Sequence, residues 1–253
     1  MAKAKGEIRL NTDTGFLKLL AIFFMAIDHA GKALFPQYAI LRIIGRLAFP
    51  LFAYCLTVGC CYTHSMPKYI LRVALLAILS QPIYAVALSH TTPAMNAIME
   101  SGEWTARNAW VFYAQSWSHP SILLSILYGL FVLWSLREEK YIATALLLLG
   151  LLYLHLYLDY GWKGIVLMAL FYLFREKPLT SLVWVGGFML WWGISSGGGY
   201  SLFGVRFGIQ AFAVFALPLI YIPTSTGIKG GKWLFYLFYP AHLIVIAVLR
   251  HFL

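Results

Sequence analysis

The sequence predicts an all-α membrane protein, a polytopic bundle of about nine transmembrane helices that forms a single domain over residues 1–253. Hydrophobic residues make up 61% of the 253 residues and charged residues only 11%, and the mean hydropathy is +0.78. That composition is too apolar for a soluble protein of this size. The apolar runs lack the alternation of period two that membrane strands require, so the predicted spans are helical.

Nine apolar segments are candidate membrane spans, because a helix of about 20 residues crosses the hydrocarbon core. They cover residues 15–35, 39–62, 69–89, 119–136, 141–158, 162–175, 179–195, 207–223 and 234–252. Their boundaries are weakest between 141 and 175, where Tyr157 to Lys163 separates two short helices that form either one hairpin or a partly re-entrant pair. No repeat or linker divides the chain.

The positive charges predict the orientation of the chain in a bacterial cytoplasmic membrane. With a cytoplasmic N-terminus, the inside segments hold Lys3, Lys5, Arg9, Lys18, Lys68, Arg72, Arg137, Lys140, Arg175, Lys177, Lys229 and Lys232. The outside segments and span ends hold Lys32, Arg42, Arg107, Lys163, Arg206 and Arg250. This excess follows the positive-inside rule. The net charge of +10 therefore indicates topology and contact with anionic lipid, and nucleic acid is not an expected partner.

Other local features define the first span and the loops. The first apolar run has no small-residue cleavage site, so we expect it to remain as an anchor. Cys55, Cys60 and Cys61 lie in one span without further ligands at metal spacing, which predicts neither a disulfide nor a metal site. The tryptophan-rich stretch from His90 to Pro120 is either an aromatic belt or a docking lid outside the membrane. Ser195 to Gly204 is expected to be a flexible turn.

Asp28 and His29 are neighbouring polar residues inside the first span, where an ionisable side chain is costly and is most often functional. At ~1.5 Å per residue, Asp28 lies about 20 Å from the inner end of its span. Arg46 lies at a matching depth on the next span, so the two are expected to pair. The pair is either purely structural or part of a site. His29 titrates near neutral pH and is a candidate general base.

The last span carries a second intramembrane histidine, His242, three residues after Tyr239 on the same helix face. Pro240 lies between them and frees a backbone carbonyl, which is tolerated at membrane depth beside a cavity or a neighbouring helix. His242 is either a packed histidine bonded to a carbonyl or a member of the site.

Three basic residues are expected near the inner ends of the first spans: Lys18, Lys68 and Arg72. Ammonium and guanidinium groups are common phosphate partners, so these residues are candidate ligands for the phosphates of an anionic cofactor. The alternative is that they serve topology alone.

Four blocks of sequence resemble the TraX family of conjugation-associated membrane proteins. They are LKLLAIFFMAIDHAGKAL (Leu17 to Leu34), IIGRLAFPLFAYCLTVG (Ile43 to Gly59), YTHSMPKYILR (Tyr62 to Arg72) and LFYLFYPAHLIVI (Leu234 to Ile246). The resemblance spans almost the whole chain in the same order. TraX proteins are in turn similar to wider transmembrane acyltransferases, including acyltransferase family 3, which pass an acetyl group from cytosolic acetyl-CoA to an acceptor at or beyond the membrane.

The resemblance implies roles for individual residues. The basic residue and histidine that the wider group separates by ten residues correspond to Lys18 and His29, with His29 in the catalytic position. The late tyrosine-histidine element corresponds to Tyr239 and His242. The Asp-His and Gly-Arg-x-Ala-Phe-Pro pattern of the TraX family is met by Asp28, His29, Gly45, Arg46, Ala48, Phe49 and Pro50.

The expected function is therefore that of a membrane acetyltransferase with acetyl-CoA as co-substrate and His29 as the base. The resemblance implies an acceptor protein or glycan at the membrane, and family founders are implicated in N-acetylation of pilin. N- and O-transfer, and direct transfer or an acetyl-histidine relay, stay open. The alternatives are a proton-coupled transporter, in which the same residues form a relay, and a non-catalytic membrane assembly factor for conjugation.

Overall fold

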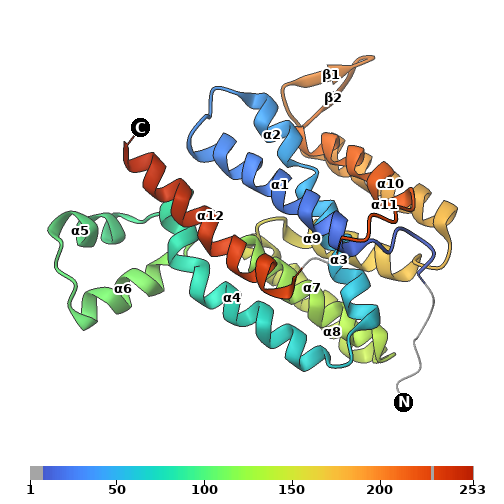
Figure 1. Cartoon of the computed structure of the whole chain (residues 1–253), viewed down its shortest axis with the longest axis horizontal. Helices are drawn as coiled ribbons and strands as arrows, with labels where there is room; N and C mark the ends of the chain where they lie inside the picture. The colour runs from blue at the N-terminus through green and yellow to red at the C-terminus, as the bar shows by residue number, and fades with distance from the viewer. Residues whose placement is uncertain (1–7, 229–230, 253) are drawn as a thin grey trace.

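The computed structural model describes residues 8–228 and 231–252, without the side chains of residues 232 and 233. The described chain is helical apart from one small hairpin (Figure 1). Its α-helices are α1 (Thr14–Ala33), α2 (Ala39–Gly45), α3 (Ala48–Tyr62), α4 (Met66–Ala87), α5 (Pro93–Ser101), α6 (Ala106–Ser116), α7 (Ile122–Arg137), α8 (Tyr141–Leu154), α9 (Gly161–Leu173), α10 (Pro178–Ser195), α11 (Leu217–Tyr221) and α12 (Lys232–Phe252). Short 3₁₀ segments cover His155–Tyr157 and Ile209–Ala216.

Four stretches in the described part of the chain are long and apolar enough to cross a membrane. They are Thr14–Ala33, Ala39–Tyr62, Met66–Ala87 and Leu234–Phe252. Shorter apolar helices cover Ile122–Arg137, Tyr141–Tyr157, Gly161–Leu173 and Ile209–Tyr221. The predicted class, a helical membrane protein, is confirmed, whereas the count of nine spans stays a prediction because several helices are too short to be assigned by length alone.

The connections between helices gather at two opposite ends of the bundle. Contacts at the first end join Arg9 to Arg175, Asn11 to Ile220, and Arg137 to Cys60 and Thr63. Contacts at the second end join Lys32 to His90, and Lys163 to Ser195. The chain therefore runs back and forth between the ends, as a polytopic protein must. The side of the membrane on which the N-terminus lies stays a prediction.

Helices α1 and α2 pack unusually closely because glycines face the contact. A Cβ atom added at Gly31 would lie 2.6 Å from the Cβ of Leu41, and one added at Gly45 would collide with Asp28. Only a residue without a side chain allows this approach. The result brings the start of the second long apolar stretch directly against Asp28.

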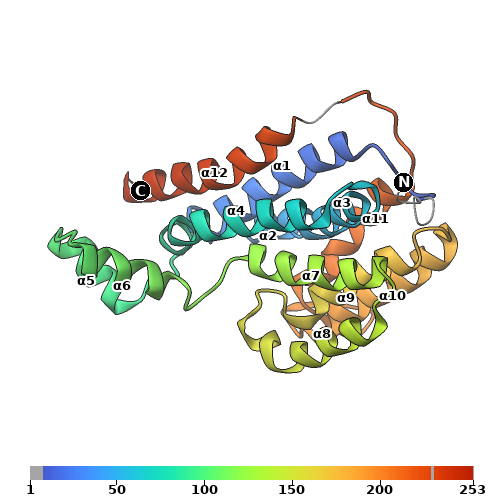
Figure 2. The same cartoon turned by 90° about the horizontal axis from the view of Figure 1, so that it is seen from below.

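Two connections are more ordered than the sequence predicts. The stretch from His90 to Pro120 contains α5 and α6, which project from the bundle beside the C-terminus in both views (Figures 1 and 2). The predicted turn after Ser195 includes an antiparallel hairpin of β1 (Tyr200–Leu202) and β2 (Val205–Phe207). Glycine-rich composition indicates a turn but does not reveal that its flanks pair.

Candidate active site

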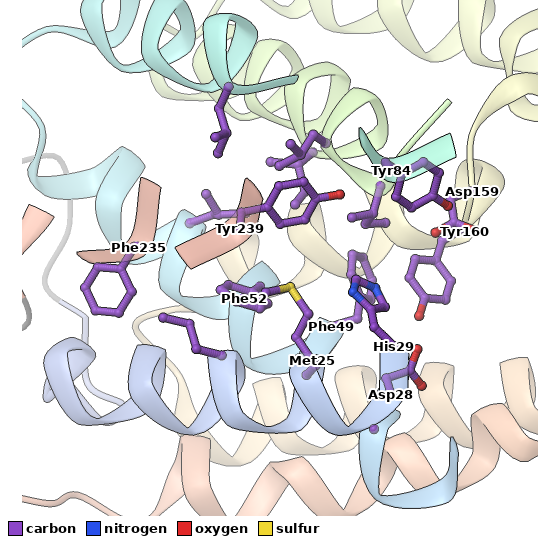
Figure 3. Close-up of a pocket in the computed structure, with 18 of the residues that line it drawn as sticks. Met25, Asp28, His29, Phe49, Phe52, Tyr84, Asp159, Tyr160, Phe235 and Tyr239 are labelled. Carbon is purple, nitrogen blue, oxygen red and sulfur yellow. The ribbon is translucent and has the colours of Figure 1, made fainter. Parts of the chain in front are cut away.

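A cavity of about 270 Å³ lies among α1, α3, α4, α7 and α12 (Figure 3). Its lining follows one face of α1 through Lys18, Ile22, Met25, His29 and Lys32. The spacing of three and four residues is that of a single helix face, and the fourteen residue steps from Lys18 to Lys32 span about 21 Å. We call the two ends of the cavity the Lys18 end and the Lys32 end.

His29 and His242 form a hydrogen-bonded pair whose tautomers follow from the geometry. The Nδ1 atom of His242 lies 2.8 Å from the carbonyl oxygen of Phe238, which only accepts, so this nitrogen carries the proton. The Nε2 atom of neutral His242 is then an acceptor, and it lies 2.8 Å from the Nδ1 atom of His29. His29 therefore donates from Nδ1, and its Nε2 atom keeps the lone pair.

The Nε2 atom of His29 is thus available as a base. Both imidazole rings are buried, each 8% exposed, and they stack with centroids 5.1 Å apart. The His29 side chain lines the cavity, and no residue in the described ranges forms a hydrogen bond with its Nε2 atom. A proton taken up at Nε2 leaves the Nδ1 hydrogen bond to His242 intact, so His242 orients the ring in both protonation states.

Asp28 is held by two arginines rather than one. The Nη2 atom of Arg46 pairs with Oδ1 of Asp28, and the Nη1 atom of Arg42 lies 2.6 Å from Oδ2. Arg42 also donates to the backbone oxygen of Asp28. The predicted pairing of Asp28 with Arg46 is confirmed. Two charge-assisted partners therefore fix the Asp28 carboxylate in place.

Arg42 was missed by the sequence reasoning, which placed it among the cations at span ends. It lies one helical turn before Arg46 on α2, so both guanidinium groups reach the same carboxylate. The spacing of four residues is the signal that identifies it.

The three predicted phosphate-binding residues lie in different places. Lys18 lines the cavity, with its Nζ atom 5.5 Å from the ring centroid of Phe235. Arg72 lies outside the cavity and donates to the hydroxyl of Tyr236, a lining residue, at 3.3 Å. Lys68 is exposed and does not line the cavity. The geometry therefore favours Lys18, and the binding roles of all three stay predictions.

Tyr239 lines the cavity on α12, one turn before His242, and its ring meets the His242 ring edge-on. Its buried hydroxyl faces that of Ser121 without the geometry of a normal hydrogen bond. Tyr239 and His242 share a face, as their spacing predicts. Pro240 lies inside α12 between them.

Ionisable groups also surround the Lys32 end. The Nζ atom of Lys32 lies 2.7 Å from Nε2 of His90, whose ring stacks on Tyr84 and His119. Burial, followed by the charge of Lys32, lowers the pKa of His90 to about 4. Asp159, which follows the 3₁₀ segment after α8, also lines the cavity. Its side chain is open to the cavity, yet the surrounding protein desolvates the carboxylate and raises its pKa.

Comparison with known proteins shows the family to which this chain belongs. The family model described as TraX protein matches residues 13–250, which include both histidines, Asp28 and both arginines. The chain belongs to the TraX family. Its match to the family covers almost the full length.

Two relatives show how far the similarity of this TraX-family protein extends. It is 23% identical over 250 residues to the probable fimbrial assembly protein FimC, serogroup H1, of Dichelobacter nodosus, covering 94% of this chain and 95% of the relative. It is 29% identical over 145 residues to an uncharacterized protein of Rickettsia prowazekii, covering 55% of each chain. No solved structure matches.

Proposed function

We propose that this TraX-family protein is an integral membrane acetyltransferase that moves an acetyl group from acetyl-CoA to an amine or hydroxyl of an acceptor. The observation that carries the proposal is that His29 lines a cavity while its Nδ1 atom is held by His242, itself bonded to the Phe238 carbonyl, which leaves the lone pair on His29 Nε2. A neutral imidazole with an oriented second nitrogen is the arrangement that general-base catalysis requires. The proposal includes nine spans and a cytoplasmic N-terminus.

The size and lining of the cavity fit one part of acetyl-CoA. At about 270 Å³ it is slightly smaller than typical ligand pockets, which measure roughly 300–1,000 Å³. Aromatic and aliphatic side chains, among them Phe52, Leu76 and Tyr69, dominate the wall between Lys18 and His29. We therefore place the acyl-bearing arm inside and the phosphates near Lys18. Arg72 is close enough to the rim to assist through Tyr236.

In the proposed reaction, His29 transfers the proton and Arg46 stabilises the developing charge. His29 Nε2 accepts the proton of the acceptor nitrogen or oxygen while this atom forms its bond to the acetyl carbon. The carbon–sulfur bond breaks, and the proton passes from His29 to the departing thiolate, which leaves as the thiol of CoA. Asp28 and Arg42 position Arg46 at the wall beside His29, where its charge stabilises negative charge that develops on the carbonyl oxygen.

The name of the Dichelobacter nodosus relative bears on the acceptor. That protein is a probable fimbrial assembly protein, and similarity along nearly the whole length of both chains makes a pilin-like protein the first acceptor to test. A membrane glycan is the second.

The proposal is tested in bacterial membrane vesicles that receive isotope-labelled acetyl-CoA. Vesicles with the wild-type chain should contain a membrane protein or glycan that is heavier by one acetyl group, as measured by intact mass. The matched variants are His29→Gln in the cavity and His155→Gln on the exposed 3₁₀ segment. Only His29→Gln should abolish the shift, and labelling that is equal in all three samples would refute the proposal.

One observation favours a second candidate, a proton-coupled transporter. The cavity lining extends from Lys18 to Lys32 and contains His29 and Asp159, so titratable groups follow its length. A transporter should move protons in sealed vesicles without acetyl-CoA. Proton movement without any acetyl transfer would replace the first proposal with this one, whereas an assembly factor should show neither activity.

A further inference from the structure

Tyr160 lies at the cavity wall in a position that sequence reasoning did not single out. It precedes α9, in the connection from α8, and its ring packs on Phe49 with centroids 4.3 Å apart. Trp192 also packs against this ring at a nearly perpendicular angle, with centroids 5.4 Å apart. Two aromatic contacts from α3 and α10 therefore hold the ring, and Tyr160 is one of the residues that line the cavity.

The hydrogen bonding of this hydroxyl leaves its proton available. The Nη1 atom of Arg46 donates to the Tyr160 oxygen at 3.2 Å. A guanidinium has no acceptor atom, so the oxygen accepts in this bond and its own proton points elsewhere. No residue within the two described ranges accepts that proton. Figure 3 shows the hydroxyl directed toward the side of the cavity that contains His29 and Asp28.

The neighbouring charges strengthen this donor. Arg46 is only 8% exposed and is itself fixed by Asp28, whose other oxygen is bonded to Arg42. A cation that donates to the hydroxyl oxygen polarises the O–H bond, and in a chain of hydrogen bonds each bond strengthens the next. The ordered chain from Arg42 through Asp28 and Arg46 therefore ends at a polarised hydroxyl beside the proposed base.

We propose that Tyr160 is a second catalytic residue, whose hydroxyl donates a hydrogen bond to the carbonyl oxygen of the acyl group as negative charge develops there. This inference rests on the proposed transferase activity. The proton stays on Tyr160 throughout, because the hydrogen bond only strengthens as the carbonyl carbon becomes tetrahedral and weakens again when the carbon–sulfur bond breaks. His29 handles the proton of the acceptor, so the two residues have separate tasks.

The first test is Tyr160→Phe in purified protein reconstituted into liposomes, with Tyr128→Phe as the matched control. Phenylalanine at position 160 keeps both ring contacts and lacks only the hydroxyl. Tyr128→Phe likewise removes one hydroxyl, whose hydrogen bond to the Leu147 oxygen lies outside the cavity. Loss of one donor to a developing oxyanion lowers kcat by about 100-fold to 1,000-fold. We expect that loss with little change in KM for acetyl-CoA or in Tm, and no loss in the control.

The measured rates distinguish the role of Tyr160 from the acetyltransferase activity itself. A wild-type protein without acetyl transfer would overturn both. If the wild-type protein is active and Tyr160→Phe has the same kcat, only the role of Tyr160 is overturned. The same holds if Tyr160→Phe changes KM and leaves kcat unchanged.

A second variant serves if Tyr160→Phe does not fold. A fluorotyrosine at position 160 ionises at lower pH and should move the alkaline decline of kcat to lower pH, because the ionised oxygen has no proton to donate. A hydroxyl that only supports Arg46 would bind the guanidinium more strongly once ionised. An unchanged alkaline profile would therefore contradict the catalytic role.

Discussion

At the residue scale, the site depends on which hydrogen-bonding atoms are already occupied. Asp28, His29, Arg46, Tyr239 and His242 are all candidates from the sequence, because an ionisable or hydrogen-bonding side chain in an apolar span needs a partner. The sequence did not show that His29 faces His242. That contact joins residues 213 positions apart, and no local pattern reports it.

The ion-pair cluster should contribute strongly to stability. In Asp28→Ala, two cations lose their shared carboxylate inside the bundle, and breaking such a buried pair costs about 3–5 kcal/mol. The free energy of unfolding in detergent measures this loss. Glu138→Ala removes an ion pair with Arg137 in which the glutamate is 46% exposed, and it should cost less than about 1 kcal/mol. Equal losses in the two variants would contradict the account.

The pair of Lys32 and His90 predicts a dependence of stability on pH. The pKa of His90 falls from an ordinary value of 6.5 to about 4 on folding, so the unfolded chain binds the proton first as pH decreases. The free energy of unfolding is unaffected by His90 above pH 6.5, where the residue is neutral in both states. It decreases as the pH falls from 6.5 toward 4, because only the unfolded chain gains the proton there. We expect the Tm of the wild type to decrease more over this window than that of His90→Gln, and parallel curves would exclude the linkage.

At the element scale, composition and spacing predict most helices but not how closely they approach. The apolar runs near 15–35, 39–62 and 69–89 correspond to α1, to α2 with α3, and to α4. The run predicted over 207–223 is divided between a 3₁₀ helix, Ile209–Ala216, and the short α11, a distinction that hydropathy does not make. The close contact of α1 and α2 depends on glycines whose partners lie on another helix.

Substitution of Gly45 tests that contact. The methyl group of Gly45→Ala would collide with Asp28, so α2 must move and carry Arg42 and Arg46 with it. Overpacking of this kind costs about 1–3 kcal/mol, and transfer should fall together with Tm. Gly187→Ala on α10 meets nothing within 4 Å and should leave both unchanged or slightly raise Tm. A Gly45→Ala protein with normal Tm and activity would show that the approach is not required.

At the scale of the whole molecule, the helices enclose a cavity that extends from Lys18 to Lys32. Charge and hydropathy predicted a membrane bundle with two sets of connections, because both follow from the chemistry of the bilayer. The order of helices around the cavity depends on contacts between distant segments, among them α12 with α4 and α1. For that reason the sequence indicated Lys18, Lys68 and Arg72 equally, whereas the structure distinguishes them.

Cofactor binding tests the assigned direction of the cavity. Acetyl-CoA should raise the Tm of the detergent-solubilised protein in a concentration-dependent way, because a ligand stabilises the folded state that binds it. Lys18→Ala should reduce this shift, whereas Lys140→Ala, on the exposed connection between α7 and α8, should not. If acetyl-CoA raises the Tm of both variants by the same amount, the phosphates do not bind at Lys18.

The most direct test of the central claim, that the lone pair of His29 Nε2 performs the proton transfer, is the kcat of His29→Gln in reconstituted protein with a saturating acceptor. General-base catalysis contributes about 100-fold to 10,000-fold to a rate, so kcat should fall by that factor while acetyl-CoA still raises the Tm. A His29→Gln protein that binds acetyl-CoA and transfers the acetyl group at the wild-type rate would contradict the account.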